Sequence, residues 1–471
     1  MIRRTLGSIG VMLELGGDRL LGTTGDIMVH GVSTDTRTIQ PGNLYIPIRG
    51  PRFNGHDYVR EAIASGAVAA LWGAGEGEPP AGVPLLIVDD TVAALQQLAA
   101  VYRRQLSTRV VGVTGSNGKT STKDILAGLL SVAYRTQKTA GNLNNELGVP
   151  LTLLSLAEET EVAVVEMGMS GLREIALLST LARPDVAIIT SVSEVHLADL
   201  HTRERIVEAK LEILEGLAPE GLFIYNADNP RLTGRLDELE TTVERLAFGE
   251  AERHALHPTS WKLSEAGIAF TVNDPAYGPL FLPMLGKHQL LNALGAIAAA
   301  RHLGLTPEQV RQGLLRVEAT GMRQEMVAVG HLMVINDAYK SNPPSLRAAL
   351  ETLMTLQPHK RKVAVIGSMV ELGEESDELH TAIGEGLDPS RIDRVLTIGA
   401  SAALIAAAAS SRYPAGAVTA FGEDERAELM AALQAEAGGD CIILVKGSRS
   451  LKLEALVDEL LAYAREREAV R

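Results

Sequence analysis

The chain of 471 residues contains a single cysteine, Cys441, so it can form neither an intrachain disulfide nor a thiolate metal cluster. Cys441 opens an apolar run that ends at Val445, a setting that favours a small core residue over a nucleophile. Aromatic residues make up only 4% of the chain and the net charge is -14, which argues against a nucleic-acid-binding surface. We therefore expect no nucleic-acid partner.

Long apolar runs are also missing. None approaches the roughly 20 residues that span a bilayer. The start, from Met1 to Leu15, superficially resembles a signal peptide, but Glu14 interrupts its apolar stretch and no small-residue cleavage site follows. We expect a cytoplasmic protein without membrane insertion.

What the chain does contain is material for several globular cores. Hydrophobic residues make up 46% and charged residues 22% of it, and its length suggests two to four domains at roughly 100–200 residues each. Three regions differ in pattern. Residues 1–106 combine short strands, turns and two helices, whereas 107–320 and 321–471 each alternate strands with helices. This order predicts three α/β domains, with doubly wound parallel sheets in the second and third.

A glycine-rich segment lies between the strand expected at 109–113 and the helix expected at 119–130. Its glycines let backbone N–H groups surround a phosphate, Lys119 supplies a cation, and Thr120 or Ser121 can meet Mg²⁺. Val113 stands where the standard phosphate loop has glycine, so the loop is a variant; a turn without ligand is the alternative. The segment is Thr114-Gly115-Ser116-Asn117-Gly118-Lys119-Thr120-Ser121.

Three further candidates follow later elements of the same region. Glu166 directly follows the strand expected at 162–165 and could hold Mg²⁺. His196 follows a strand expected over 186–192, and Lys210 lies in a helical stretch. Each alone is more often a surface or structural residue. Because ligands gather at the carboxyl ends of strands in open α/β sheets, a shared Mg-nucleotide site is expected.

Together these segments, in collinear order over nearly the whole chain, resemble the Mur ligases. The stretch 141–150 is similar to the motif of the member that adds D-alanyl-D-alanine, and Ala209–Glu212 is similar to the segment whose lysine is carbamylated. Further similar segments are 35–37, 41–42, 54–57, 114–120, 166–168, 193–197, 286–292, 336–343, 371–373 and 445–450.

The resemblance implies an ATP-dependent amide ligase with an N-terminal UDP-binding domain, a central ATPase domain and a C-terminal Rossmann-like domain. Its implied ligands are ATP, two Mg²⁺, UDP-N-acetylmuramoyl-tripeptide and D-alanyl-D-alanine, and we expect a monomer. Lys119 would meet the β- and γ-phosphates, Thr120 and Glu166 one Mg²⁺, and His196 with carbamylated Lys210 the other. The remaining implied contacts are Asn292, Arg323 and Asp337 to adenosine, Asp35, Thr36 and Arg37 to UDP, and Asn142, Asn144, Asn145, Asn342, Lys446, Ser448 and Arg449 to substrate.

Several positions depart from the family pattern. Gln289 and Lys340 stand where asparagine is usual, Leu211 replaces glycine, and 198–201 differs from the usual Glu-x-x-Gly. On residue type alone, 35–37 is also an ordinary turn, Asn144 and Asn145 ordinary loop caps, and Lys446 with its neighbours a basic loop. A hinge is expected near 317–323, with domain closure that excludes water from the acyl phosphate.

Other functions stay open on the residues alone. A sister ligase that adds the third peptide residue, or a folylpolyglutamate-type ligase, would share the phosphate loop but is disfavoured by 141–150. The string 228–231 matches a motif diagnostic of that sister, yet it lies in the middle region rather than the last domain. A nucleotide-dependent switch needs only the phosphate loop, and Gln289 and Lys340 would suit an inactive paralogue.

Overall fold

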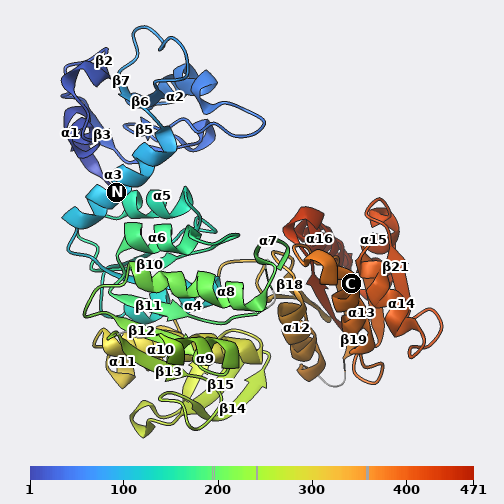
Figure 1. Ribbon diagram of the computed structural model, residues 1–471. Coiled ribbons are helices and arrows are strands. Elements are labelled where there is room, and N and C mark those ends of the chain that lie inside the picture. Colours follow the sequence, from blue (N-terminus) through green and yellow to red (C-terminus); the bar gives the residue numbers. More distant parts are fainter. Residues whose placement is uncertain (194, 196, 240–241, 357–359, 471) are drawn as a thin grey trace.

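The computed structural model describes residues 1–193, 195, 197–239, 242–356 and 360–470. It has three α/β domains, as the sequence pattern predicts, and the central domain lies between the other two (Figure 1). No helix among the described residues is long and apolar enough to cross a bilayer.

The N-terminal domain is built on a five-stranded sheet in the order β2-β7-β6-β5-β4 and a two-stranded sheet of β1 and β3. The apolar start of the chain belongs to its core, because Ile2, Leu6 and Ile9 are fully buried. Its elements are β1 (Arg3–Thr5), α1 (Leu6–Met12), η1 (Gly17–Arg19), β2 (Leu20–Leu21), β3 (Met28–His30), β4 (Val32–Ser33), η2 (Thr36–Thr38), β5 (Leu44–Tyr45), η3 (Gly55–Tyr58), α2 (Val59–Ala64), β6 (Ala69–Gly73), β7 (Leu85–Val88) and α3 (Thr91–Gln105).

The central domain holds a six-stranded parallel sheet in the order β13-β12-β11-β8-β10-β9. Its strands are β8 (Arg109–Thr114), β9 (Thr136–Lys138), β10 (Val162–Glu166), β11 (Val186–Ile189), β12 (Leu222–Asn226) and β13 (Glu244–Phe248). Its helices are α4 (Lys119–Leu130), α5 (Gly148–Ser155), α6 (Glu174–Ala182), α7 (Leu197–Leu200), α8 (Arg203–Leu211), η4 (Glu212–Glu215), α9 (Pro230–Glu238), η5 (Pro275–Tyr277), α10 (Lys287–His302) and α11 (Pro307–Leu314).

A separate antiparallel sheet of β14 (Pro258–Ser264), β15 (Gly267–Val272) and β16 (Leu280–Leu282) follows β13 and was not expected from the sequence. Its inner side shares a core with α10 and the central sheet, where Phe270, Leu282 and Leu294 are buried. The pattern of alternating helices and strands gave no sign of it, since these strands follow one another through short turns.

The C-terminal domain has a six-stranded sheet in the order β17-β18-β22-β19-β20-β21, parallel except for β17. The elements are β17 (Glu325–Val329), β18 (Leu332–Asp337), α12 (Pro343–Thr355), β19 (Arg361–Gly367), η6 (Gly373–Glu375), α13 (Ser376–Glu385), β20 (Arg394–Ile398), α14 (Ala402–Ser410), β21 (Val418–Phe421), α15 (Arg426–Glu436), β22 (Cys441–Lys446), η7 (Arg449–Leu451) and α16 (Leu453–Val470).

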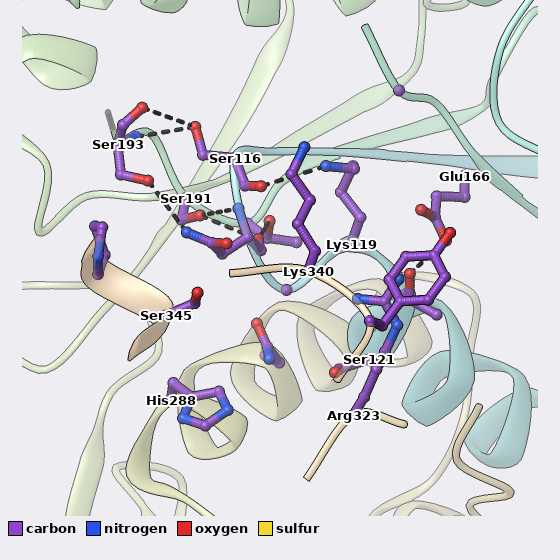
Figure 2. A pocket seen from close by; sticks show the side chains of 18 of the residues that line it. Ser116, Lys119, Ser121, Glu166, Ser191, Ser193, His288, Arg323, Lys340 and Ser345 are labelled. Atoms are coloured by element: carbon purple, nitrogen blue, oxygen red, sulfur yellow. Dashed lines mark hydrogen bonds between the residues drawn. The ribbon is translucent and has the colours of Figure 1, made fainter. Parts of the chain in front are cut away.

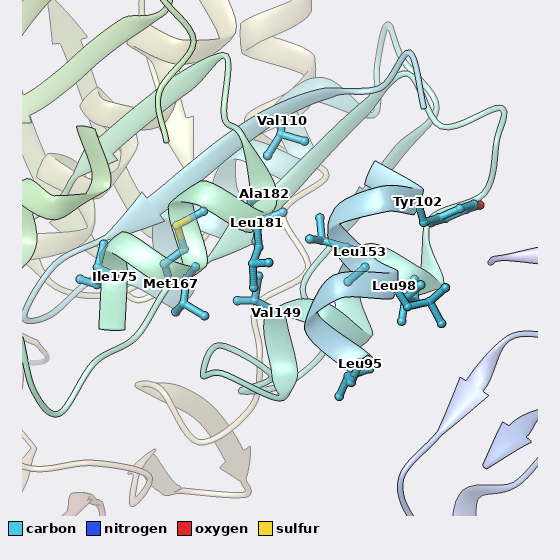
Figure 3. Packing of buried hydrophobic residues seen from close by; sticks show 14 of the residues in the cluster. Leu95, Leu98, Tyr102, Val110, Val149, Leu153, Met167, Ile175, Leu181 and Ala182 are labelled. Carbon is cyan, nitrogen blue, oxygen red and sulfur yellow. The ribbon is translucent and has the colours of Figure 1, made fainter. Parts of the chain in front are cut away.

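One hydrophobic core joins the N-terminal and central domains. Leu95, Leu98 and Tyr102 on α3 pack with Val149 and Leu153 on α5 (Figure 3). The hydroxyl of Tyr102 also donates to the backbone carbonyl oxygen of Leu156, the residue after α5, at 2.8 Å. Helix α3 therefore ties the two domains through buried apolar surface rather than through an extended linker.

This shared core predicts a large cost for Leu98→Ala. Leu98 is 0% exposed, so the substitution should reduce the free energy of unfolding by about 2–5 kcal/mol. Urea unfolding followed by the fluorescence of the two tryptophans, Trp72 and Trp261, measures this change. Leu315, 62% exposed, is the matched control, because Leu315→Ala should change stability by less than about 0.5 kcal/mol. Equal effects of the two substitutions would contradict the shared core.

Candidate active site between the central and C-terminal domains

A cavity of about 800 Å³ lies between the central and C-terminal domains (Figure 2). The central domain contributes the phosphate loop and residues that follow β9, β10 and β11. The C-terminal domain contributes residues that follow β18 together with Lys446 at the end of β22. The carboxyl ends of two parallel sheets therefore face one space, which is where ligands bind in open α/β folds.

The phosphate loop turns sharply into α4 at Gly118. This residue has φ of +81°, a left-handed conformation that favours glycine, and a Cβ here would collide with the side-chain amide of Asn292. The backbone is thereby free to approach a phosphate at the N-terminus of a 12-residue helix. Asn292, expected near adenosine, thus lies directly beside the loop, and its amide donates to Gln289 at 2.9 Å.

Hydroxyl groups after β11 fix the loop from the other side. The backbone N–H of Asn117 donates to the hydroxyl of Ser191 at 2.9 Å, and that of Ser193 donates to the hydroxyl of Ser116 at 2.9 Å. The strand expected over 186–192 consequently ends at Ile189, because the chain leaves the sheet to bind the phosphate loop. Thr190 takes part as well, with its hydroxyl donating to the carbonyl of Asn117.

Lys119 begins α4, and its ammonium folds back over the loop. It donates to the carbonyl oxygen of Gly115 at 2.6 Å. Burial lowers its pKa to about 8, with the positive charges of Lys340 and Arg323 acting in the same direction and Glu166 opposing them. An anion beside Lys119 would offset both the burial and the repulsion.

Glu166, the last residue of β10, accepts two side-chain hydrogen bonds inside the cavity. The hydroxyl of Thr120 donates to Oε2 at 2.9 Å, and the amide of Asn144 donates to Oε1 at 2.8 Å. A carboxylate and a hydroxyl next to a phosphate loop are hard oxygen donors of the kind Mg²⁺ uses with phosphate oxygens. The donor set therefore fits a Mg-nucleotide.

A buried lysine beneath this carboxylate escaped the sequence analysis. Lys123 is fully buried, with its ammonium 3.8 Å from Oε2 of Glu166 and 3.6 Å from Oδ1 of Asp124. Lys138 adds a second cation, 2.7 Å from the same Asp124 oxygen. The available sequence signal was the charged pair Lys123-Asp124, which begins one helical turn after Lys119 and precedes the apolar end of α4.

The remaining candidates of the central domain are placed differently. Asn142, Asn144 and Asn145 follow β9 and line the cavity. Lys210 lies on α8, 1% exposed, and outside the described lining of the cavity. Burial, with the charges of Lys119 and Lys340, lowers the pKa of Lys210 well below its usual value. His196 lies outside the described residues.

On the C-terminal side the structure pairs two residues that the sequence assigned to different ligands. Lys446, expected at the substrate, donates to Asp337, expected at adenosine, at 2.8 Å. They are direct partners in the register of β18 and β22. Arg323, which also lines the cavity, lies over the ring of Tyr339 with 4.4 Å between guanidinium and ring centre.

Asn342 joins the two domains through a reciprocal amide pair. Its amide donates to Asn117 of the phosphate loop at 2.8 Å and accepts from it at 3.2 Å. Asn342 also caps α12, accepting from the backbone N–H of Ser345 at 3.0 Å. A candidate substrate contact therefore also sets how closely α12 approaches the phosphate loop.

Candidates of the N-terminal domain and of the loop after β22 also lie away from the cavity lining. Asp35 caps η2 and forms an ion pair with Arg37 at 2.6 Å in the N-terminal domain, with Thr36 between them. Ser448 is buried and donates to the carbonyl of Ser368 at 2.9 Å, and Arg449 pairs with Glu454 at 2.8 Å. Ser448 and Arg449 therefore have structural partners.

The loop after β19 carries Glu371 into the cavity and is fixed by His380. Nε2 of the fully buried His380 accepts from the backbone N–H of Met369 at 3.0 Å, while Nδ1 donates to the carbonyl of Ser376 at 2.7 Å. This pattern requires the neutral imidazole. Burial lowers the pKa of His380 below its ordinary value, against the opposing effects of Ser376 and Asp377.

Comparison with known proteins matches three family models: Mur ligase family, catalytic domain, over 28–103; Mur ligase middle domain over 113–300; and Mur ligase, glutamate ligase domain, over 322–449. The chain is 41% identical to the UDP-N-acetylmuramoyl-tripeptide--D-alanyl-D-alanine ligase of Bacillus subtilis, covering 98% of this chain and 99% of that one. Its fold resembles MurF from Acinetobacter baumannii (TM-score 0.86, 29% identity, 98% and 99% of the chains). It also resembles MurF from Thermotoga maritima in complex with ADP (0.81, 28%, 93% and 99%).

The neutral His380 predicts a pH dependence of stability. Because its folded pKa is lowered, its contribution is complete above about pH 6.5, the ordinary histidine value, and is lost as pH falls through the folded pKa. Calorimetry of the wild type and His380→Gln at pH 7.5 and 5.5 measures this. Glutamine can still accept from Met369 but does not titrate, so the variant should lose less stability on acidification. An equal loss in both proteins would contradict the assignment.

Proposed function

This chain belongs to the Mur ligase family, and we propose that it joins D-alanyl-D-alanine to the tripeptide of UDP-N-acetylmuramoyl-tripeptide. It is an ATP-dependent ligase that forms ADP. The observation that carries the proposal is the cavity that the phosphate loop and Glu166 line together with Asn142, Asn144 and Asn145. A nucleotide site and groups suited to peptide amides thus open onto each other.

The reaction needs activation because a carboxylate is a poor electrophile. An oxygen of the tripeptide carboxylate forms a bond to the γ-phosphorus of ATP, while the bond to the bridging oxygen breaks and its electron pair leaves with ADP. The free amine of D-alanyl-D-alanine then forms the C–N bond to the acyl phosphate. Inorganic phosphate leaves with the electron pair of the C–O bond, and the nitrogen releases a proton. The protein supplies position and charge neutralisation.

Each central residue has a place in this scheme. We assign Lys119 to the β- and γ-phosphates, with backbone N–H groups of the phosphate loop as further donors. Thr120 and Glu166 would hold Mg²⁺, and a carbamate on Lys210 would serve a second ion. When bound, Mg²⁺ neutralises phosphate charge and orients the γ-phosphoryl group. Carbamylation needs a neutral amine, which the buried setting of Lys210 favours.

The two other substrates fit the remaining parts of the molecule. We place the UDP end in the N-terminal domain near Asp35 and Arg37, so the peptide runs toward the central domain. Asn142 and Asn145 are exposed at the cavity, where their amides can bond peptide groups, and Lys446 offers a cation on the opposite side. One chain provides every residue in this assignment, so a monomer is sufficient.

The direct test is phosphate release from ATP and Mg²⁺ with UDP-N-acetylmuramoyl-tripeptide, with and without D-alanyl-D-alanine. We expect release to require both substrates and a new amide product to appear by mass spectrometry. Release with another amino acid in place of the dipeptide would move the chain to a sister ligase. Release without any peptide would favour a nucleotide switch.

A carbamate on Lys210 predicts that removing this side chain lowers kcat and that short carboxylates restore part of it. Lys210→Ala should lower kcat by about 100-fold, the upper range for removing groups around a metal. Added short carboxylic acids should restore part of it by supplying the missing carboxylate. Lys262, an exposed lysine on β14, is the matched control, and Lys262→Ala should keep its activity. Full activity of Lys210→Ala would exclude the carbamate role.

A further inference from the structure

Lys340 and Lys446 are the lysines with which the C-terminal domain lines the described cavity. Lys340 lies between β18 and α12 and lines the cavity from the C-terminal side. Its backbone carbonyl accepts from the ammonium of Lys446 at 3.0 Å. Two residues later, Asn342 exchanges amide hydrogen bonds with Asn117 of the phosphate loop. The backbone of Lys340 is therefore held on both sides, directly across from the loop.

The Lys340 side chain faces the same part of the cavity as Lys119 (Figure 2). The two ammonium groups thus repel each other across a space that opens on the phosphate loop. Such a pair is stabilised by an anion that bonds both, and a transferring phosphoryl group carries charge on three oxygens.

Glu371 forms an ion pair with Lys340 and leaves part of its side chain exposed. Its Oε2 lies 3.1 Å from the ammonium, and the two side chains remain 38% (Lys340) and 41% (Glu371) exposed to the cleft. The ammonium has three donor hydrogens, so it can bond a phosphoryl oxygen while it keeps the carboxylate. Glu371 comes from the loop that His380 fixes, so both members of the ion pair belong to the C-terminal domain.

We propose that Lys340 is a catalytic residue that binds the γ-phosphoryl group during its transfer to the substrate carboxylate. The inference rests on the proposed ligase function. Lys340 remains an ammonium throughout and exchanges no proton; it stabilises negative charge as the bond to ADP breaks and the bond to the carboxylate forms. Because the C-terminal domain carries Lys340, the distance between this charge and the phosphate loop depends on how the two domains are arranged. The departure from asparagine at this position is then a functional substitution.

Steady-state kinetics and ADP binding of Lys340→Met, Lys340→Arg and Glu371→Gln test the proposal. Removing a preorganised cation from the reacting group should lower the kcat of Lys340→Met by about 10²–10³-fold. Its KM for ATP and its affinity for ADP, which lacks the γ-phosphate, should change less than threefold, roughly 0.6 kcal/mol. Lys340→Arg should retain most of the kcat that Lys340→Met loses. The loss of kcat in Glu371→Gln should be far smaller than that in Lys340→Met.

Two results would overturn the proposal. Equal losses in Lys340→Met and Glu371→Gln would mean that the ion pair only supports the loop, and wild-type kcat in Lys340→Met would remove any role. Thermal unfolding of each variant checks the fold, and the retained ADP affinity does so at the site. Failure of the wild type to form the amide would instead reject the proposed function, so the two failures are distinguishable.

Discussion

The carboxylate of Glu166 connects the parts on which the site depends. One oxygen accepts from Thr120 at the start of the phosphate helix, and the other accepts from Asn144 in the loop after β9. The backbone N–H of Glu166 donates to the hydroxyl of Thr139, and Lys123 lies beneath it. A charge buried at this depth is tolerated only with such partners. The phosphate loop and the loop after β9 are consequently fixed relative to each other by one residue.

The second constraint lies in how the C-terminal domain is attached. Asp124, on the phosphate helix, accepts from the backbone N–H of Thr320 at 2.8 Å, and Lys138 donates to the carbonyl of Glu318 at 3.2 Å. The linker up to Thr320 is therefore bound to the central domain. Beyond it, Met322 and Gln324 adopt positive φ angles of 60° and 54°. Rotation about 321–324 would move Lys340, Lys446 and Asn342 together, as one body, relative to the phosphate loop.

Local sequence patterns predicted the helix and the strand that flank the phosphate loop. The helix over 119–130 forms as the sequence indicates, and the strand expected over 186–192 forms as far as Ile189, because apolar runs and a glycine turn determine them locally. The Lys446–Asp337 pair could not be predicted, since it depends on the register between strands that lie 109 positions apart. Lys123 was missed for a related reason. One of its acidic partners, Glu166, lies on strand β10, and the other, the adjacent Asp124, has the sequence pattern of an exposed charge. The antiparallel sheet of β14 to β16 lacks the helix alternation that marked the other strands.

The proposed role of Glu166 is to hold the Mg²⁺ of a nucleotide bound at the phosphate loop. Titration calorimetry of a non-hydrolysable ATP analogue, with and without Mg²⁺, tests it on the wild type and Glu166→Gln. Glutamine keeps the shape of the side chain but removes its charge. We expect Mg²⁺ to tighten binding of the analogue to the wild type and most of this gain to disappear in Glu166→Gln, while binding without Mg²⁺ remains similar. A variant that keeps the full Mg²⁺-dependent gain would contradict it.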